Sequence, residues 1–306
     1  NKAGVALDYS LFSSLGTTGI GIDFARVGIS SNNLGDHSRN MTTIFAEHRF
    51  LLFGDQLDIT PGIAFNNYTD FGTHFFPGID FGFAFNTQFR AYGNVGSTYR
   101  IPTYTDLFYS DSTTIGNANL KPESAVAVEL GLRYTGFMFS FSVAYFNRNS
   151  EDLIDYVKDT EAARWEANNI QEVTSGGFEF ESIFKYTFSI HPQSFRLGYT
   201  NIDDEVKGVT EYNFSRYSIN SLKNHFTLRS FNQWSNTISS GIVLKVAERT
   251  LGEPYTVLDF NAQWASPNKA FRITFLLNNL FDEVYTETNL VPMPERNGSL
   301  GVQFSF

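Results

Sequence analysis

Apolar and polar side chains alternate with a period of two along much of this sequence. In the clearest stretch, Val126, Val128 and Leu130 are separated by small or charged residues. A β-strand points successive side chains to opposite faces, whereas a helix would need a repeat near 3.6 residues. The alternation marks the stretches 126–134, 137–145, 178–188 and 271–277. The sequence therefore predicts an all-β chain whose strands have one apolar face.

The opposite face of these strands carries charge. In the stretch that begins at Phe178, the alternate positions include Glu179, Glu181 and Lys185. A closed apolar core would not accept unpaired charges at such positions, whereas the wet interior of a transmembrane barrel would. We therefore expect four charged side chains to face a lumen: Glu129, Arg133, Glu179 and Glu181.

The lengths of the strands and of their connections favour an antiparallel transmembrane barrel. The alternation gives about 15 strands, most of about 10 to 14 residues, and crossing a bilayer at a tilt needs roughly 9 to 11. Short turns are expected near 13–16, 53–55, 86–87, 135–136, 191–192, 232–235 and 266–268, and longer polar loops near 30–39, 67–73, 101–120, 155–164, 201–217, 247–253 and 280–295. Short periplasmic turns and long extracellular loops are typical of bacterial outer-membrane barrels.

A soluble sandwich or propeller is the alternative all-β fold. It is disfavoured because globular strands are shorter and because a propeller would show repeats of fixed period. No linker or low-complexity segment divides the sequence, so a single partial-barrel domain is expected over residues 1–306.

The composition excludes several other classes of protein. The 306 residues include no cysteine, which rules out disulfides and thiolate sites. The net charge of −10 disfavours nucleic acid as a partner. No apolar run approaches the roughly 18 residues of a membrane-spanning helix. The five histidines are widely spaced and no nucleophile motif is present, so the sequence predicts no metal site, no cofactor and no enzyme activity.

The sequence ends in an alternating strand that stops on an aromatic residue. Its apolar positions are Leu300, Val302, Phe304 and Phe306. The ending, with Phe304 and Phe306, resembles the signal that the barrel-assembly machinery recognises, and we expect Val302, Phe304 and Phe306 to face lipid. Because bacterial single-chain barrels have an even number of strands, about 15 strands imply that this sequence starts inside a barrel, next to an extracellular loop.

Three motifs follow one another between residues 99 and 296. The first joins Tyr99-Arg100-Ile101-Pro102-Thr103 to Gly116-Asn117-Ala118-Asn119-Leu120-Lys121-Pro122-Glu123; the second runs from Ala144-Tyr145-Phe146 through Asp152-Leu153-Ile154 to Asn169-Ile170 and Gly176-Gly177-Phe178-Glu179; the third is Asn278-Asn279-Leu280-Phe281-Asp282 with Tyr285, Pro292, Pro294 and Arg296. In this order and spacing they closely resemble the TonB-dependent receptors of the bacterial outer membrane. The segment 33–39 is similar to receptors of the cobalamin type from Bacteroidetes-like bacteria.

We expect the motif residues to hold the barrel together. They are Arg100, Pro102, Thr103, Asn119, Leu120, Lys121, Pro122, Glu123, Asn278, Asn279, Leu280, Phe281, Asp282 and Arg296. Pro102 and Pro122 cannot donate to a strand ladder, so they suit the margins where pairing ends. Lys121 and Glu123 are expected to pair at the rim.

The resemblance implies a 22-stranded barrel closed by an amino-terminal plug, which carries the segment engaged by TonB. No plug is recognisable in this sequence, and about seven strands would also be missing. The implied partners are outer-membrane lipid, the barrel-assembly machinery, a transported ligand and, through the missing part, TonB. The resemblance leaves open whether a surface lipoprotein covers the barrel.

Ligand capture is expected from the long loops, because aromatic rings offer flat contact area and Arg suits carboxylates. The candidates are Tyr104, Phe108, Tyr109, Tyr156, Trp165, Tyr212, Phe214, Arg216, Tyr217, Tyr285 and Met293. For each of them the alternative is loop packing or membership of the interfacial aromatic girdle.

The charge of the loops bears on which ligand they suit. Few cations accompany five acids: Asp106, Asp111, Asp203, Asp204 and Glu205. A strongly anionic ferric siderophore would be repelled there, whereas nearly neutral, amide-rich cobalamin would not. The sequence thus predicts active uptake of cobalamin or a ferric chelate, with cobalamin favoured. A passive porin-like or adhesion barrel without a plug is the alternative from another class.

Overall fold

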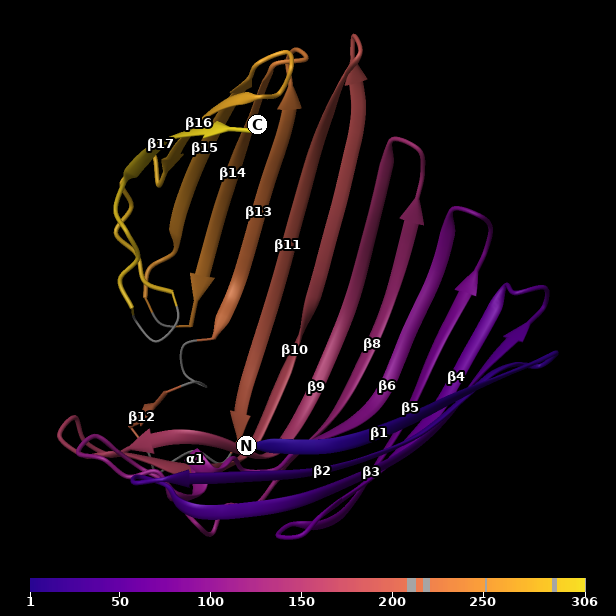
Figure 1. The fold of residues 1–306 in the computed structure, drawn as a ribbon, viewed down its shortest axis with the longest axis vertical. Coiled ribbons are helices and arrows are strands. Elements are labelled where there is room, and N and C mark those ends of the chain that lie inside the picture. Colours follow the sequence, from indigo (N-terminus) through magenta and orange to yellow (C-terminus); the bar gives the residue numbers. More distant parts are fainter. Residues whose placement is uncertain (208–212, 217–220, 251, 288–290, 306) are drawn as a thin grey trace. The chain divides into compact units, whose positions relative to one another are not determined.

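The structure of the chain is a computed structural model that describes residues 1–207, 213–216, 221–250, 252–287 and 291–305, without the side chains at 170 and 171. It divides into two compact units. The first comprises 1–132, 145–176 and 204–219, and the second comprises 133–144, 177–203 and 220–306. Among the described residues there are seventeen strands and one short helix, so the all-β prediction is confirmed (Figure 1).

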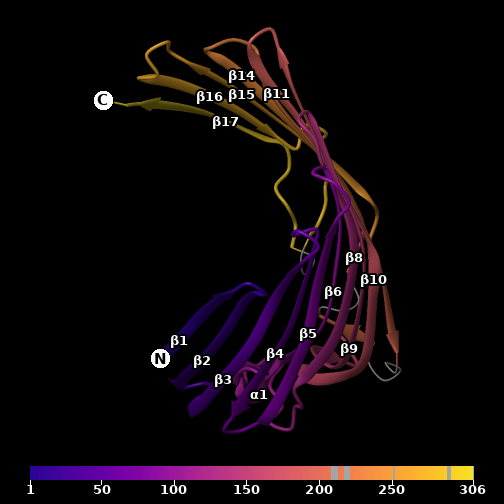
Figure 2. The same ribbon diagram turned by 90° about the vertical axis from the view of Figure 1, so that its right-hand side faces the viewer.

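Most strands of the first unit follow one another in antiparallel hairpins (Figure 2). They are β1 (Lys2–Ser13), β2 (Gly16–Ser31), β3 (Gly35–Leu52), β4 (Leu57–Tyr68), β5 (Gly72–Ala84) and β6 (Phe89–Arg100), followed by α1 (Tyr104–Phe108), β7 (Thr114–Ile115) and most of β8 (Glu123–Thr135). The outer ends of β9 (Phe139–Lys158) and β10 (Trp165–Phe188) also belong to this unit, as does β12 (Phe214–Ser215). β6 pairs with β8, so the segment between them leaves the sheet as a loop that carries α1.

The second unit continues the same pattern. It contains the remaining parts of β9 and β10 with β11 (His191–Lys207), β13 (Leu222–Gln233), β14 (Ile238–Arg249), β15 (Tyr255–Ala265), β16 (Phe271–Asn278) and β17 (Asn297–Phe304). Antiparallel pairing runs from β11 through β13, β14, β15 and β16 to β17. Fifteen of the described strands have eight residues or more, which agrees with the predicted number.

The strand registers gather apolar side chains on one face of the first unit. Ile44 of β3 lies opposite Ile22 of β2 and Phe65 of β4, and Phe65 lies opposite Phe75 of β5. Directly opposed residues share a face, so these side chains form one continuous apolar surface. Phe75 is 62% exposed, far more than a residue of a closed core would be.

The other face of the first unit is polar and partly ionic. Glu47 belongs to it, because it is three positions from Ile44 along β3. Farther along the same face, Asp58 accepts from Arg90 and lies 3.7 Å from Arg49. The separation of an apolar face from a charged one is the arrangement that the alternation predicts.

The last hairpin of the second unit also carries an exposed apolar face. Phe304 pairs with Phe271 and Val302 with Ile273, and both β17 side chains are more than half exposed. Phe306, the other half of the predicted assembly signal, lies outside the described residues.

Several strands are longer than predicted, and two expected loops are tight turns. Pairing between β2 and β3 persists to Ser31 and Gly35, and pairing between β4 and β5 persists to Tyr68 and Gly72. The predicted loops at 30–39 and 67–73 therefore shrink to three residues each. Polar side chains do not end a ladder of backbone hydrogen bonds, and Gly35 and Gly72 have the positive φ that a tight turn requires.

The described helix, α1, has five residues. None of the described residues forms a helix long and apolar enough to span a membrane.

Candidate functional site

The loop between β6 and β8 is closed at its base by a bidentate ion pair. Arg100, the last residue of β6, donates from Nε and Nη2 to the carboxylate of Glu123, the first residue of β8, at 2.8 and 2.6 Å. Glu123 is buried and also accepts from the backbone N–H of Ile154 in β9. The expected pairing of Lys121 with Glu123 is thus wrong: Glu123 pairs with Arg100, and Lys121 lies 4.0 Å from Asp152.

Helix α1 begins with a capping box built from the first motif. Thr103 Oγ1 accepts from the backbone N–H of Asp106, and the Asp106 carboxylate accepts from the backbone N–H of Thr103. This arrangement satisfies two donors at the start of the helix. Asp106 is 7% exposed and also faces Arg100 at 3.4 Å and the Tyr156 hydroxyl at 3.1 Å. The Asp106 carboxylate therefore interacts with groups inside the loop and is not exposed to a ligand.

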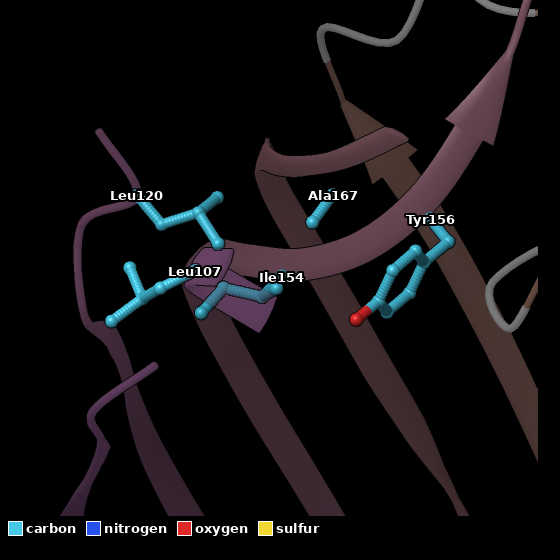
Figure 3. Packing of buried hydrophobic residues seen from close by; sticks show 5 residues of the cluster. All are labelled: Leu107, Leu120, Ile154, Tyr156 and Ala167. Carbon is cyan, nitrogen blue, oxygen red and sulfur yellow. The ribbon is translucent and has the colours of Figure 1, made fainter. Parts of the chain in front are cut away.

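A small apolar cluster holds the loop against the ends of β9 and β10. Its buried members are Leu107, Leu120, Ile154, Tyr156 and Ala167, and Phe71, Phe108 and Trp165 pack against them (Figure 3). Burying such side chains contributes about 1.5–3 kcal/mol for each large one. Tyr156, predicted as a loop residue, instead lies in β9 and is buried, because β9 pairs up to Lys158.

Asn169 of β10 connects this loop to β9. Its side chain accepts from the backbone N–H of Lys121 and donates to the Lys121 carbonyl, both at 2.9 Å. The same amide nitrogen donates to the carbonyl of Asp152 at 2.6 Å. Asn119 lies in the turn just before, where its N–H donates to the Asn117 side chain. These hydrogen bonds join residues 48 positions apart in the sequence.

Arg39 of β3 anchors the same loop to the polar face of the first unit. Its guanidinium pairs with Asp70 at 2.7 Å, donates to the carbonyl of Pro102 and lies 5.0 Å from the rings of Phe71 and Tyr104. Arg39 and Glu47 are eight positions apart in an unbroken strand, so they share a face. The loop that carries α1 therefore lies over the polar face.

Two other predicted ligand-binding residues of this loop, Phe108 and Tyr109, contact nearby side chains. The Phe108 ring stacks on His37 with centroids 3.8 Å apart, and the Tyr109 hydroxyl donates to Asp111. The backbone N–H of Thr113, followed by the Tyr109 hydroxyl, lowers the pKa of Asp111 to about 2. Asp111 is consequently a fixed negative charge at the rim of the loop.

Cations and aromatic rings meet where β12 pairs with β9. Lys158 Nζ lies 4.7 Å from the Trp165 ring centre, and the Arg216 guanidinium lies 5.0 Å from it. Phe214 is directly opposite Lys158 in the strand register. The candidates Trp165, Phe214 and Arg216 are therefore brought together with Lys158, a residue that sequence reasoning missed. Tyr212 and Tyr217 lie outside the described residues.

The third motif organises the loop between β16 and β17 in the second unit. Asn279 is 2% exposed; its side chain donates to the carbonyls of Glu283 and Pro294, and its N–H donates to Asp259. Asp282 pairs with Arg296 at 3.3 Å. The side-chain amide of Asn278 donates to the side-chain oxygen of Asn297 across the hairpin. Leu280 and Phe281 follow directly, and Phe281 is exposed.

Tyr285 of this loop stacks on Tyr255, with ring centres 4.6 Å apart. Lys245 Nζ lies near both rings and forms an ion pair with Glu287. The hydrogen bond from Lys245 is the main cause that lowers the pKa of the Glu287 carboxyl. Met293, the other candidate here, is half-buried, and its N–H donates to the Tyr285 carbonyl.

Comparison with known proteins decides the family. The family described as TonB dependent receptor-like, beta-barrel, matches residues 2–280. This chain belongs to the TonB-dependent receptor family. It is therefore an outer-membrane barrel protein of a transport family and not an enzyme. No group of three or more metal-binding side chains occurs in the part of the chain that the structure describes.

Individual TonB-dependent receptors resemble this chain over different extents. The vitamin B12 transporter BtuB of Vibrio vulnificus is 25% identical over 227 residues, which make up 70% of this chain and 34% of that protein. Solved structures match at lower identity and share the fold alone. The siderophore receptor PirA from Pseudomonas aeruginosa has a TM-score of 0.76 at 16% identity, covering all of this chain and 55% of PirA. The ferric enterobactin receptor PfeA from the same species, solved with enterobactin, has a TM-score of 0.78 at 15% identity and is covered over 54% of its length.

The chain thus spans about a third of the length of the curated relatives and about half of the matched structures. The sequence-based identification of a partial TonB-dependent receptor barrel is confirmed.

Proposed function

We propose that this chain is the ligand-capturing barrel portion of a receptor that imports cobalamin by TonB-dependent transport. The observation that carries the proposal is the loop layer of the first unit, in which α1 and its neighbours cover the polar face of a TonB-dependent receptor barrel. Tyr104 and Phe108 of α1 keep part of their rings accessible there. Flat, half-exposed rings among hydrogen-bonding groups suit a large amide-rich ligand.

The similarity to vitamin B12 transporters supports a corrinoid over other chelates. The charge of the loops supports it less strongly than the sequence suggested. Asp106 is buried inside the loop beside Arg100, and Asp203, Asp204 and Glu205 lie in β11, which extends to Lys207. Lys207 in turn lies 3.9 Å from Glu205 and 3.8 Å from Glu172. Asp111 remains as a fixed negative charge that disfavours a strongly anionic ligand.

Transport would need TonB, acting through a plug encoded with the rest of the protein. The gene sequence upstream of Asn1 tests this requirement: a globular plug supports active transport, and a bare signal peptide would favour a passive barrel.

The ligand is tested by titrating the full-length receptor with cyanocobalamin and with ferric enterobactin at matched ionic strength. We expect saturable binding of cyanocobalamin at micromolar concentrations or below. Tight binding of the siderophore with no cobalamin signal would overturn the choice of ligand.

A further inference from the structure

Two cations contact one indole ring at the end of β9. Lys158 and Arg216 approach the Trp165 ring to 4.7 and 5.0 Å from its centre. Each is attracted by the ring, but two like charges around a single side chain repel one another. Such an arrangement is stabilised when an anion lies between or beside them.

Backbone pairing fixes the positions of these groups. β12 pairs antiparallel with β9 through Phe214 opposite Lys158, and the backbone N–H of Arg216 donates to the carbonyl of Tyr156 at 2.9 Å. Side chains two positions apart on a strand share a face, so Lys158 and Tyr156 lie beside Phe214 and Arg216. The guanidinium consequently also lies 5.4 Å from the Tyr156 ring.

Within the described part of the chain, no ion pair joins either cation to a carboxylate. Lys158 Nζ donates to the carbonyl of Glu161 at 2.8 Å, which is a neutral acceptor. The carboxylate of Asp155 is fully buried and accepts from Ser215 Oγ and from the N–H of Tyr156. The cations thus differ from Arg39 and Arg100, each of which has its own carboxylate nearby.

The cluster is connected to the polar face of the first unit. Arg39 is on that face and contacts Tyr104 of α1, while Asp106 of the same helix accepts the hydroxyl of Tyr156. The two cations are therefore placed toward the face that carries the ligand-capturing loops, opposite the apolar face that meets lipid.

We propose that Lys158, Trp165 and Arg216 form a subsite for an oxyanion attached to a flat ring system. The two cations would bind the oxyanion, and the indole would contact the adjoining ring. This inference rests on the proposed function of ligand capture. In a corrinoid the group is the phosphodiester beside the benzimidazole of the nucleotide tail, and in a siderophore it would be a carboxylate or catecholate.

The test compares ligands with and without the oxyanion on the full-length receptor. Cyanocobalamin carries the phosphodiester, dicyanocobinamide lacks the whole nucleotide tail, and ferric enterobactin supplies catecholates. The variants are Lys158→Gln and Arg216→Gln, with Lys158→Arg to restore the charge and Lys121→Gln as a matched control. Lys121 is an exposed cation of the same unit, and its ammonium lies 4.0 Å from Asp152. Migration on unheated gels and thermal unfolding check that each variant is folded.

We expect each Gln variant to weaken cyanocobalamin binding roughly tenfold, because a hydrogen bond to a charged group is lost. Binding of dicyanocobinamide should change less than about twofold, and Lys158→Arg should restore cyanocobalamin binding. Equal losses for both corrinoids, or no loss for either, would overturn the oxyanion subsite while leaving corrinoid capture intact. If the receptor binds only ferric enterobactin and the Gln variants weaken it, the subsite stands and the corrinoid assignment fails.

Discussion

The hydroxyl of Tyr156 donates to the carboxylate of Asp106 at 3.1 Å, across fifty positions of sequence. This hydrogen bond links the end of β9 to the start of α1, at a carboxylate already held by Thr103 and Arg100. It therefore ties the extracellular loop to the wall at a buried point, where a lost partner is costly.

Substitution of Tyr156 by Phe removes this hydrogen bond and keeps the packed ring. We expect the loop to lose about 1–3 kcal/mol of stability, because a buried charged acceptor is left with one donor fewer. Limited proteolysis of residues 101–122 and hydrogen exchange measure the effect. The matched control is Tyr109→Phe, which removes a solvent-exposed hydrogen bond to Asp111 and should leave the stability of the loop nearly unchanged. Equal effects of the two variants would contradict the anchoring role of Tyr156.

The pair Arg39–Asp70 should be strongly coupled. Arg39 has a side chain only 7% exposed, so a double-mutant cycle with Arg39→Gln and Asp70→Asn should give a coupling energy of about 1–3 kcal/mol. The comparison cycle uses Asp282 and Arg296, whose side chains are about half exposed. Their coupling should stay below about 1 kcal/mol, because solvent screens the pair. Chemical unfolding in lipid vesicles provides both coupling energies. A coupling energy of Arg39 with Asp70 no larger than that of Asp282 with Arg296 would argue against this anchor.

Asp111 should titrate in strongly acidic solution. Its ordinary pKa of 3.8 is lowered to about 2, first by the backbone N–H of Thr113. Since the folded-state pKa is depressed, the stabilisation is fully present above about pH 4 and is lost as the pH falls through about 2. Carbon-detected NMR of the carboxyl gives the midpoint. Tyr109→Phe removes one donor and should raise that midpoint. A midpoint at or above the ordinary value in the unsubstituted protein would show that these hydrogen bonds do not form.

A new charge should destabilise the protein far more on one face of β3 than on the other. Ile44→Lys places a cation on the apolar face, midway along the strand, and should cost about 2–4 kcal/mol if that position is near the bilayer centre. Thr43→Lys changes the neighbouring residue on the polar face, opposite Asp23 and Asn66, and should cost much less. Chemical unfolding in vesicles and the yield of inserted protein measure the effect of each substitution. A larger loss for Thr43→Lys would mean that the faces have been assigned the wrong way round.

The sequence was sufficient for the strand pattern because periodicity is a local property. Alternation such as that around Val128 depends only on neighbouring residues, and the motifs at 100–123 and 278–296 are short enough to recognise directly. The apolar face and the loops predicted near 101–120 and 280–295 follow from these signals. In the structure, the connections from β6 to β8 and from β16 to β17 contain these loops.

Contacts between distant residues could not be predicted in this way. Arg39 and Asp70 are 31 positions apart, and the hydrogen bonds from Asn169 to Lys121 span 48. The closeness of Lys121 and Glu123 in the sequence predicts that they pair, but Glu123 accepts from Arg100 in the structure. The sequence alone does not single out Lys158, because its place beside Phe214 depends on β12, which pairs with β9 through only two residues. The charges of the segment 201–217 predict a loop, whereas β11 continues to Lys207.

The alternation of side chains also determines how the polypeptide behaves before it folds. Thr43 directly precedes Ile44 in the chain. The alternation therefore gives the translocase no continuous apolar segment that would stop export. The surface that binds lipid comes into existence only when Ile22, Ile44 and Phe65 are aligned by neighbouring strands. The unfolded polypeptide can thus cross the inner membrane without being retained in it. At the outer membrane, pairing of the strands creates the apolar surface that holds the folded protein in the bilayer.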